Sequence, residues 1–458
     1  MSALDAEFLH LEDSNSHMHI AGICTFANPA PSIQELETLV ASKLHLLPRY
    51  RQRVRLVPLE LGRPVWVDDP HFNIGYHIRH TALPAPGDAA ALRHLMGRLM
   101  SQPLDRHRPL WEAWLTEGLD GDRWALICKV HHSMVDGIAG VGLLEMLLDL
   151  SPEVDVAEPK EWSAEPEPSV AAVIGDAWKG AIGDGVRMAS RSISKIADPA
   201  AALRAAKDLG GGLIGLGQRL VNTPSSSIQG PVGPHRRWTY TTADLAVVKQ
   251  IGRAHGATVN DVVLAAVTSG FRDLLTAHGD DPGIVVVRSL VPVSVRGSDG
   301  EGIADNRVSA LLLELPVSAE DPLERLEAVK DAMSELKGSH MVEAADAVVN
   351  IGNLAPPVVL GAATRMAMRA QHFVSQRSIA TVTTNVPGPQ FPLYCLGREM
   401  LEYLPFVPII SGVRIGTAIL SYNGALAFGI TGDWDTASDV DTLAAGIDAA
   451  IVELASTI

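Results

Sequence analysis

The stretch WALICKVHHSMVDGIAGVGLLEMLLDL, residues 124–150, decides the fold class. Up to His132 it is a nearly continuous apolar run, which predicts a buried strand. A short loop follows, and residues 137–150 then predict an amphipathic helix, with apolar side chains at helical spacing: Ile138, Val141, Leu144, Leu147 and Leu148. A strand that leads through a loop into a helix is typical of a mixed α/β protein.

Two histidines end this expected strand. Successive strand residues point to opposite faces, so His131 and His132 cannot share one task in one pocket. The face that carries Val130 and His132 is the more apolar, and we expect it to point inward, with Lys129 and His131 on the opposite face. His132 would then lie at the end of a buried strand, within reach of a channel.

Three interpretations of the histidine loop compete. A metal site needs convergent ligands, which adjacent strand histidines do not supply, so we expect no metal. A structural histidine would be accompanied by Asp136 as an ordinary helix N-cap. A general base is the third interpretation, because imidazole titrates near neutrality and accepts a proton from a hydroxyl group.

The rest of the chain has the same mixed pattern. Apolar spacing predicts helices at residues 32–47, 89–100, 258–275, 323–336 and 438–454. Strands are expected at residues 111–115, 284–295, 308–316 and 381–386. Residues 415–431 predict a β-hairpin that turns at Asn423-Gly424. The expected fold is therefore two α/β halves.

A change in composition separates these halves. Residues 151–168 hold six acidic residues, four prolines and one lysine, which indicates a solvated linker. Residues 176–225 hold seven Lys or Arg against four Asp, and we read them as connecting helices or as a basic amphipathic element that touches lipid. We expect an N-terminal domain at 1–150, a linker and crossover at 151–235, and a C-terminal domain at 236–458.

Charge and cysteine content exclude several classes of protein. The 458 residues carry a net charge of −16, which argues against nucleic-acid binding as the main task. Cys24, Cys128 and Cys395 are far apart, so we expect no disulfide framework and a cytoplasmic location. The first residues do not resemble a signal peptide. No membrane span is expected, because Pro356-Pro357 interrupts the uncharged run at 347–364.

The histidine loop resembles a known signature. His131-His132-x-x-x-Asp136-Gly137 is similar to the HHxxxDG motif of the CoA-dependent acyltransferase superfamily, which includes chloramphenicol acetyltransferase and peptide-synthetase condensation domains. Further segments resemble bacterial wax ester synthase/diacylglycerol acyltransferases, and most closely actinobacterial triacylglycerol synthases. They are Leu4-Asp5-Ala6-x-Phe8-Leu9-x-Leu11-Glu12 with Met18-His19, Pro109-Leu110-Trp111-Glu112, Asn260-Asp261, Leu290–Arg296, Asn306-Arg307 and Thr384-Asn385-Val386-Pro387-Gly388-Pro389. One departure is Ile228-Gln229-Gly230-Pro231, where the family more often has Leu-Asn-Gly-Pro.

The resemblance implies a two-domain chloramphenicol-acetyltransferase-like α/β fold with an interdomain tunnel. It implies that His132 is the general base, with His131, Asp136 and Gly137 as the other catalytic-loop residues, and that no acyl-enzyme forms. Asp136 in the superfamily usually braces the loop through an arginine. The candidates here are Arg49, Arg51, Arg53 and Arg288.

The other motifs carry a structural and a functional reading each. Pro109, Leu110 and Trp111 either pack in the core or shape the substrate tunnel, and Asn260 and Asp261 either cap a helix or line the mouth of the site. Thr383, Thr384 and Asn385 end a strand, where relatives often place an oxyanion donor. Arg365, Arg369 and Arg377 are candidates for binding the CoA phosphates.

The expected function is diacylglycerol O-acyltransferase, with acyl-CoA as co-substrate and no bound cofactor. Three alternatives stay open: a wax ester synthase that uses a long-chain alcohol, a condensation-type acyltransferase that uses a carrier protein, and a non-catalytic lipid-surface protein. A cytoplasmic protein of this kind could also contact the inner face of the membrane or lipid droplets peripherally.

Overall fold

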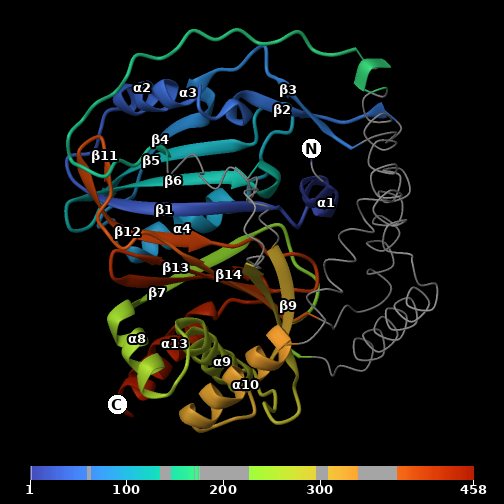
Figure 1. Cartoon of the computed structure of the whole chain (residues 1–458), viewed down its shortest axis with the longest axis vertical. Helices are drawn as coiled ribbons and strands as arrows, with labels where there is room; N and C mark the ends of the chain where they lie inside the picture. The colour runs from blue at the N-terminus through green and yellow to red at the C-terminus, as the bar shows by residue number, and fades with distance from the viewer. Residues whose placement is uncertain are drawn as a thin grey trace, which may run out of the picture.

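The computed structural model describes residues 1, 3–58, 63–134, 146–169, 171–173, 175, 226–294, 308–338 and 379–458. In this part of the chain, two six-stranded sheets lie one over the other, and helices cover their outer faces (Figure 1). Several predictions lie outside the described residues. They concern Asp136, Gly137, residues 176–225 and 347–364, and the arginines at 365, 369 and 377.

The first sheet holds the histidine strand near its centre. Its order is β11-β12-β1-β6-β5-β4, and only β4 and β5 pair in parallel. Helices α2 (Ile33–Lys43) and α3 (Ile74–His77) lie above it in Figure 1, beside the short ribbon of β2 (Gln52–Arg55) and β3 (Val65–Asp68). The strands are β1 (His19–Ala27), β4 (Ile78–Ala82), β5 (Trp111–Leu119), β6 (Arg123–His131), β11 (Tyr394–Cys395) and β12 (Arg398–Phe406).

The second sheet has the order β7-β14-β13-β10-β8-β9. Its strands are β7 (Arg236–Asp244), β8 (Val287–Ser294), β9 (Val308–Leu315), β10 (Thr381–Pro387), β13 (Ile415–Tyr422) and β14 (Ala425–Asp433). The helices on its outer face are α8 (Leu245–Ala254), α9 (Val259–Ala277), α10 (Pro322–Gly338) and α13 (Val440–Ala455). The predicted hairpin is confirmed, because β13 and β14 turn at Asn423 and Gly424, whose φ angles are 43° and 86°.

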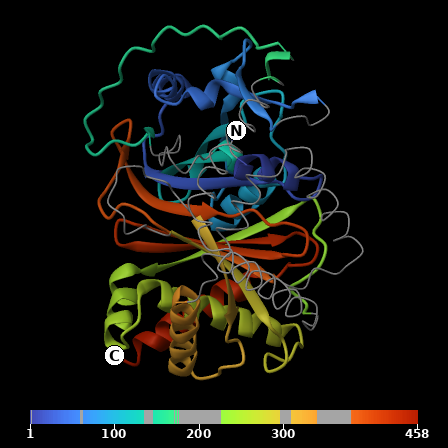
Figure 2. The same ribbon diagram turned by 45° about the vertical axis from the view of Figure 1, so that its right-hand side comes forward.

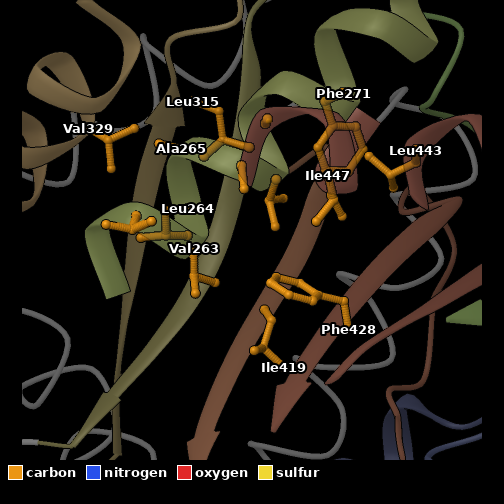
Figure 3. Close-up of a cluster of buried hydrophobic side chains, with 14 of the residues drawn as sticks. Val263, Leu264, Ala265, Phe271, Leu315, Val329, Ile419, Phe428, Leu443 and Ile447 are labelled. Carbon is orange, nitrogen blue, oxygen red and sulfur yellow. The ribbon is translucent and has the colours of Figure 1, made fainter. Parts of the chain in front are cut away.

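Helix α4 (Ala89–Met100) helps to join the two sheets. Its residues Leu95 and Met96 belong to one buried cluster with Ile127 of the first sheet and Trp238 of the second. A larger cluster lies on the outer face of the second sheet, where side chains of α9 and α13 meet those of β13 and β14 (Figure 3). The two sheets and their helices therefore form one continuous packed body.

The prediction that only one face of the histidine strand would be inward is wrong. Lys129 and His131 are completely buried, as is Ile127 on the same face. The reason is that α4 and the second sheet cover this face of the first sheet. Lys129 Nζ donates to the carbonyl of Leu99, 2.9 Å away, and to that of Gln102, so its charge is held at the C-terminal end of α4.

The two sheets do not follow the order of the chain. Strands β11 and β12, from the region expected to form the C-terminal domain, belong to the first sheet. Residues 21–26 of β1 pair with β12 in antiparallel register, from Ala21 opposite Phe406 to Phe26 opposite Met400. The C-terminal part of the chain therefore completes the sheet that carries the histidines.

The described residues form neither a membrane-spanning helix nor a cluster of metal ligands. No described helix is both long and apolar enough to cross a membrane. Nor do the described histidine, cysteine, aspartate and glutamate side chains gather in any group of three that could hold a metal ion.

Candidate active site

Strand β6 ends at His131, and His132 begins a short 3-10 turn, η3 (His132–Met134). The backbone N–H of His131 donates to the carbonyl of Leu110, and that of His132 donates to the carbonyl of Met18, at 2.9 and 2.8 Å. The turn is therefore fixed between the residues that precede β5 and β1.

The His132 imidazole lies half-buried against the N-terminal helix α1 (Ala3–Leu11). Its ring centroid is 4.0 Å from that of Phe8, and Figure 2 shows α1 beside β1 at the level of the first sheet. Burial, with a smaller contribution from the neighbouring His131, lowers the pKa of His132 to about 4. The imidazole is therefore neutral at physiological pH, which is the form that a general base requires.

His131 is fully buried and faces away from His132 along the strand. Its Nδ1 accepts from the backbone N–H of Ser133 at 3.1 Å and lies 2.7 Å from Ser133 Oγ. A ring nitrogen that accepts an N–H bond carries no proton, so the proton of the neutral ring is on Nε2. This Nε2 faces Glu12 Oε2 at 3.5 Å.

Glu12 follows α1 and is nearly inaccessible, with 8% of its side chain exposed. Its carboxylate lies 3.3 Å from His19 Nε2 and 2.6 Å from Arg106 Nη2. Burial alone would raise the pKa of Glu12, but His131, His19 and Arg106 together hold it well below its usual range. Glu12 is therefore ionised beneath the histidine turn.

The Pro109-Leu110-Trp111 motif packs in the core. All three residues are buried, and Trp111 is opposite Val130 of the histidine strand. The indole Nε1 of Trp111 donates to the Tyr50 carbonyl at 2.8 Å, and its ring stacks on His77 with centroids 4.6 Å apart. The core-packing interpretation is thus confirmed, and the role in a tunnel stays a prediction.

The expected helix-capping role of Asp261 is confirmed. Asp261 and Thr258 form a reciprocal capping box at the start of α9, in which Asp261 Oδ2 accepts from the Thr258 backbone N–H at 2.8 Å. The neighbouring Asn260 instead accepts, through Oδ1, a 3.1 Å hydrogen bond from Asn385 Nδ2 of β10. The structure therefore brings together two residues that the sequence analysis named separately.

The polar residues at the end of β10, Thr383, Thr384 and Asn385, differ in how deeply they are buried. Thr383 is buried, and its Oγ1 accepts from Ser289 Oγ at 2.8 Å. Thr384 and Asn385 are only partly buried, and Thr384 is paired with Ala418 of β13. Among these three residues, Thr384 and Asn385 thus remain the accessible candidates for an oxyanion donor.

The candidate arginine partners of Asp136 have other contacts. Arg49 lies over Trp66 and Arg51 over Trp162, at 4.5 and 4.8 Å from the ring centroids. Arg53 pairs with Glu167 at 3.1 Å, and Arg288 pairs with Glu314 across β8 and β9 at 3.5 Å. Asp136 itself is outside the described residues, so its pairing stays a prediction.

Sequence reasoning missed three contacts, those of Phe8 with His132, of Glu12 with His131 and of Arg106 with Glu12. Glu12 and Phe8 stand in a quoted motif, and Arg106 lies three residues before Pro109. One sequence signal pointed to Glu12. It follows an apolar helical segment and is close to histidines in the sequence, and a carboxylate that is buried in such a place needs a charged partner. The pairing itself depends on how the first sheet brings α1 to β6.

This architecture defines a class of protein. Two stacked α/β halves with a histidine turn at the end of a central strand form the two-domain chloramphenicol-acetyltransferase-like fold. A trichothecene 15-O-acetyltransferase of Fusarium sporotrichioides shares this fold, with a TM-score of 0.61 and 13% identity over 99% of this chain and 94% of that one.

The chain belongs to the wax ester synthase/diacylglycerol acyltransferase family. The family's catalytic domain matches residues 1–263, and its C-terminal domain matches residues 304–455. A probable diacylglycerol O-acyltransferase of Mycobacterium tuberculosis is 37% identical over 99% of this chain and 95% of its own length. A solved wax ester synthase/diacylglycerol acyltransferase from Marinobacter aquaeolei has a TM-score of 0.69 at 25% identity, covering 99% of this chain and 98% of that one. The protein is therefore an acyltransferase, which acts on an acyl donor and an acceptor.

Proposed function

We propose that this acyltransferase transfers a fatty acyl group from acyl-CoA to the hydroxyl of a diacylglycerol, forming triacylglycerol and CoA. The observation that carries the proposal is the neutral His132 imidazole at the end of β6, within the HHxxxDG motif. The similarity to a probable mycobacterial diacylglycerol O-acyltransferase supports the choice of a diacylglycerol acceptor.

His132 is the general base in this proposal. It takes the proton of the acceptor hydroxyl as the oxygen attacks the thioester carbonyl. The tetrahedral intermediate then collapses, the C–S bond breaks, and the imidazolium returns its proton to the leaving thiolate. The sum is one ester and one free thiol, and the cycle needs no acyl-enzyme and no bound cofactor.

The remaining catalysis comes from positioning and from donors to the oxyanion. General-base help typically supplies about 10²–10⁴-fold. Holding two substrates at one imidazole gives a further rate acceleration. A polar donor aimed at the developing oxyanion increases the rate again. Thr384 and Asn385 are the proposed donors, in a tunnel between the two halves.

A wax ester synthase is the second candidate, because the chemistry is the same for a long-chain alcohol. The family name and the Marinobacter aquaeolei relative support it. The carrier-protein and non-catalytic alternatives lack such support. Contact with a membrane or lipid-droplet surface is part of the proposal, because both the acceptor and the product are lipids.

A substrate matrix tests the proposal. The purified protein is given labelled oleoyl-CoA or an oleoyl-loaded carrier protein as donor, with dioleoylglycerol or hexadecanol as acceptor. We expect ester formation from oleoyl-CoA, with the diacylglycerol preferred over the alcohol. Preference for hexadecanol would establish the wax ester candidate instead, and transfer only from the carrier protein would overturn the donor.

A further inference from the structure

A buried carboxylate lies beneath the histidine turn. Glu12 is outside the expected catalytic motif. Its two carboxylate oxygens nevertheless lie close to residues of β1, of β6 and of the segment between α4 and β5. Oε1 lies 3.3 Å from His19 Nε2 at the start of β1, and Oε2 lies 2.6 Å from Arg106 Nη2 in the segment between α4 and β5. The same Oε2 faces His131 Nε2 at 3.5 Å.

The ring of His131 is oriented from both sides. The backbone N–H of Ser133 donates a hydrogen bond to Nδ1. The ring proton is therefore on Nε2, which faces Glu12. An ionised carboxylate at Nε2 favours this tautomer over the one protonated at Nδ1, which would lose the Ser133 bond. Ser133 therefore fixes one tautomer of His131 by a hydrogen bond, and the charge of Glu12, 3.5 Å from Nε2, favours the same tautomer without forming a hydrogen bond.

Glu12 also reaches the other side of His132. Its Oε1 lies 3.4 Å from the backbone N of Met18, and the carbonyl of Met18 accepts the backbone N–H of His132 at 2.8 Å. Glu12 is thus linked to the turn in two ways, directly at the His131 ring and through Met18 at the backbone N–H of His132. Loss of the charge would loosen the turn without removing any group that touches the ring of His132.

Several positive or titratable groups surround this carboxylate. They are His17 before β1, His19 at the start of β1, Lys129 and His131 on β6, and Arg106. Lys129 is completely buried, and Arg106 is 41% exposed. Glu12 is thus a negative neighbour that these groups share, and Lys129 also lies near Glu112.

We propose that Glu12 is a positioning residue for acyl transfer, whose carboxylate fixes the His131 imidazole and the turn that carries His132. The inference rests on the proposed function, because it assigns the orientation of the proposed base. Glu12 touches neither substrate in this account. It acts through His131 and, through Met18, at the backbone N–H of His132.

The test begins with Glu12→Gln in the full chain. We expect kcat to fall about 10–100-fold, as is typical when an outer group that orients a functional histidine is removed, while KM for oleoyl-CoA changes by less than about twofold. Glu335→Gln, on the exposed side of α10, is the matched control and keeps the kcat of the parent. Glu12→Asp, which keeps the charge, recovers part of the loss.

A double-mutant cycle separates positioning from mere stability. If Glu12 acts through His131, then Glu12→Gln in a His131→Gln background costs little further activity. Arg106→Gln removes the more exposed partner of Glu12 and leaves the His131 contact, so we expect a smaller loss of kcat than for Glu12→Gln. All rates are measured below the unfolding midpoint of each variant, so that only folded protein is compared.

The outcomes distinguish the inference from the function it rests on. If His132→Ala is inactive and Glu12→Gln keeps full kcat, the inference fails and the proposed function stands. Additive losses in the double mutant, or an equal loss in Arg106→Gln, also overturn the inference, since they indicate a structural role. Full activity of His132→Ala overturns both.

Discussion

At the scale of single residues, the environment of His132 predicts an unusual pH profile. Burial lowers the pKa of His132 to about 4, so the base is already neutral well below the ordinary histidine pKa of about 6.5. As pH rises, kcat/KM should therefore reach its plateau near pH 5 and show no inflection at pH 6.5. The measurement is kcat/KM for oleoyl-CoA from about pH 3.5 to about pH 8 in about half-unit steps, which cover the titration of such a base.

Phe8 covers part of the His132 ring, so its removal should shift the acid limb of the pH profile of kcat/KM. Phe8→Ala opens one side of the ring to water, which raises the pKa of His132 toward its ordinary value and shifts the acid limb to higher pH. Phe391→Ala is the matched control, because Phe391 is 49% exposed in the loop after β10. An unshifted acid limb in Phe8→Ala would show that α1 does not set this pKa.

At the scale of elements, the capping box of α9 predicts a loss of stability rather than a loss of chemistry. Thr258→Ala removes a hydroxyl that accepts from the Asp261 backbone N–H at 3.2 Å, and such a change typically costs about 1 kcal/mol. The free energy of unfolding in urea should fall by about this amount while kcat of the folded protein is kept. A large fall in kcat at unchanged stability would instead favour a role for this helix end at the mouth of the site.

The close approach of α9 and α13 gives a larger effect. A Cβ at Gly270 would lie 2.6 Å from the Leu443 carbonyl, and one at Gly446 would lie 2.7 Å from the Gly270 Cα, so the helices approach too closely for side chains there. Gly270→Ala should destabilise the protein by about 1–3 kcal/mol in urea unfolding. Gly75→Ala, whose Cβ would meet only side-chain atoms at 3.4 Å, is the control, and equal midpoints for both variants would refute the packing argument.

The elements show where sequence reasoning succeeds and where it ends. Local patterns predict the histidine strand, the helix that starts at Val259 and the hairpin at Asn423, because spacing, capping and turn chemistry are contained in neighbouring residues. The burial of Lys129 and the contact between Glu12 and His131 depend on which layers cover the first sheet. That information lies in residues far apart along the chain, and no local pattern carries it.

At the scale of the whole molecule, the first sheet needs the C-terminal part of the chain. Without β12, strand β1 would present an unpaired edge, and the N-terminal core would lose Met400 and Leu396. A fragment of residues 1–150 should therefore fail to form a cooperatively unfolding monomer, as measured by size-exclusion chromatography and thermal circular dichroism. A stable monomeric fragment would show that the N-terminal half folds independently.

Buried neutral histidines also link the stability of the whole molecule to pH. His19 and His77 are each 1% exposed, and burial lowers their pKa values to about 3 and about 4. Below pH 6.5 these two histidines are protonated in the unfolded chain but stay neutral in the folded protein. The free energy of unfolding therefore falls with falling pH, by about 1.4 kcal/mol per pH unit for each ring. His77→Gln should flatten the slope measured by urea unfolding between pH 7 and 5, and the exposed control His94→Gln should leave it unchanged.

The central claim is that His132 carries out acyl transfer from acyl-CoA to a diacylglycerol. The most direct test compares triacylglycerol formation by the parent protein and by His132→Ala, with labelled oleoyl-CoA and dioleoylglycerol at saturating concentrations. We predict triacylglycerol from the parent and a fall of at least about 10²-fold in His132→Ala, the smallest loss typical of a missing general base. Equal rates from a folded His132→Ala variant would contradict the account.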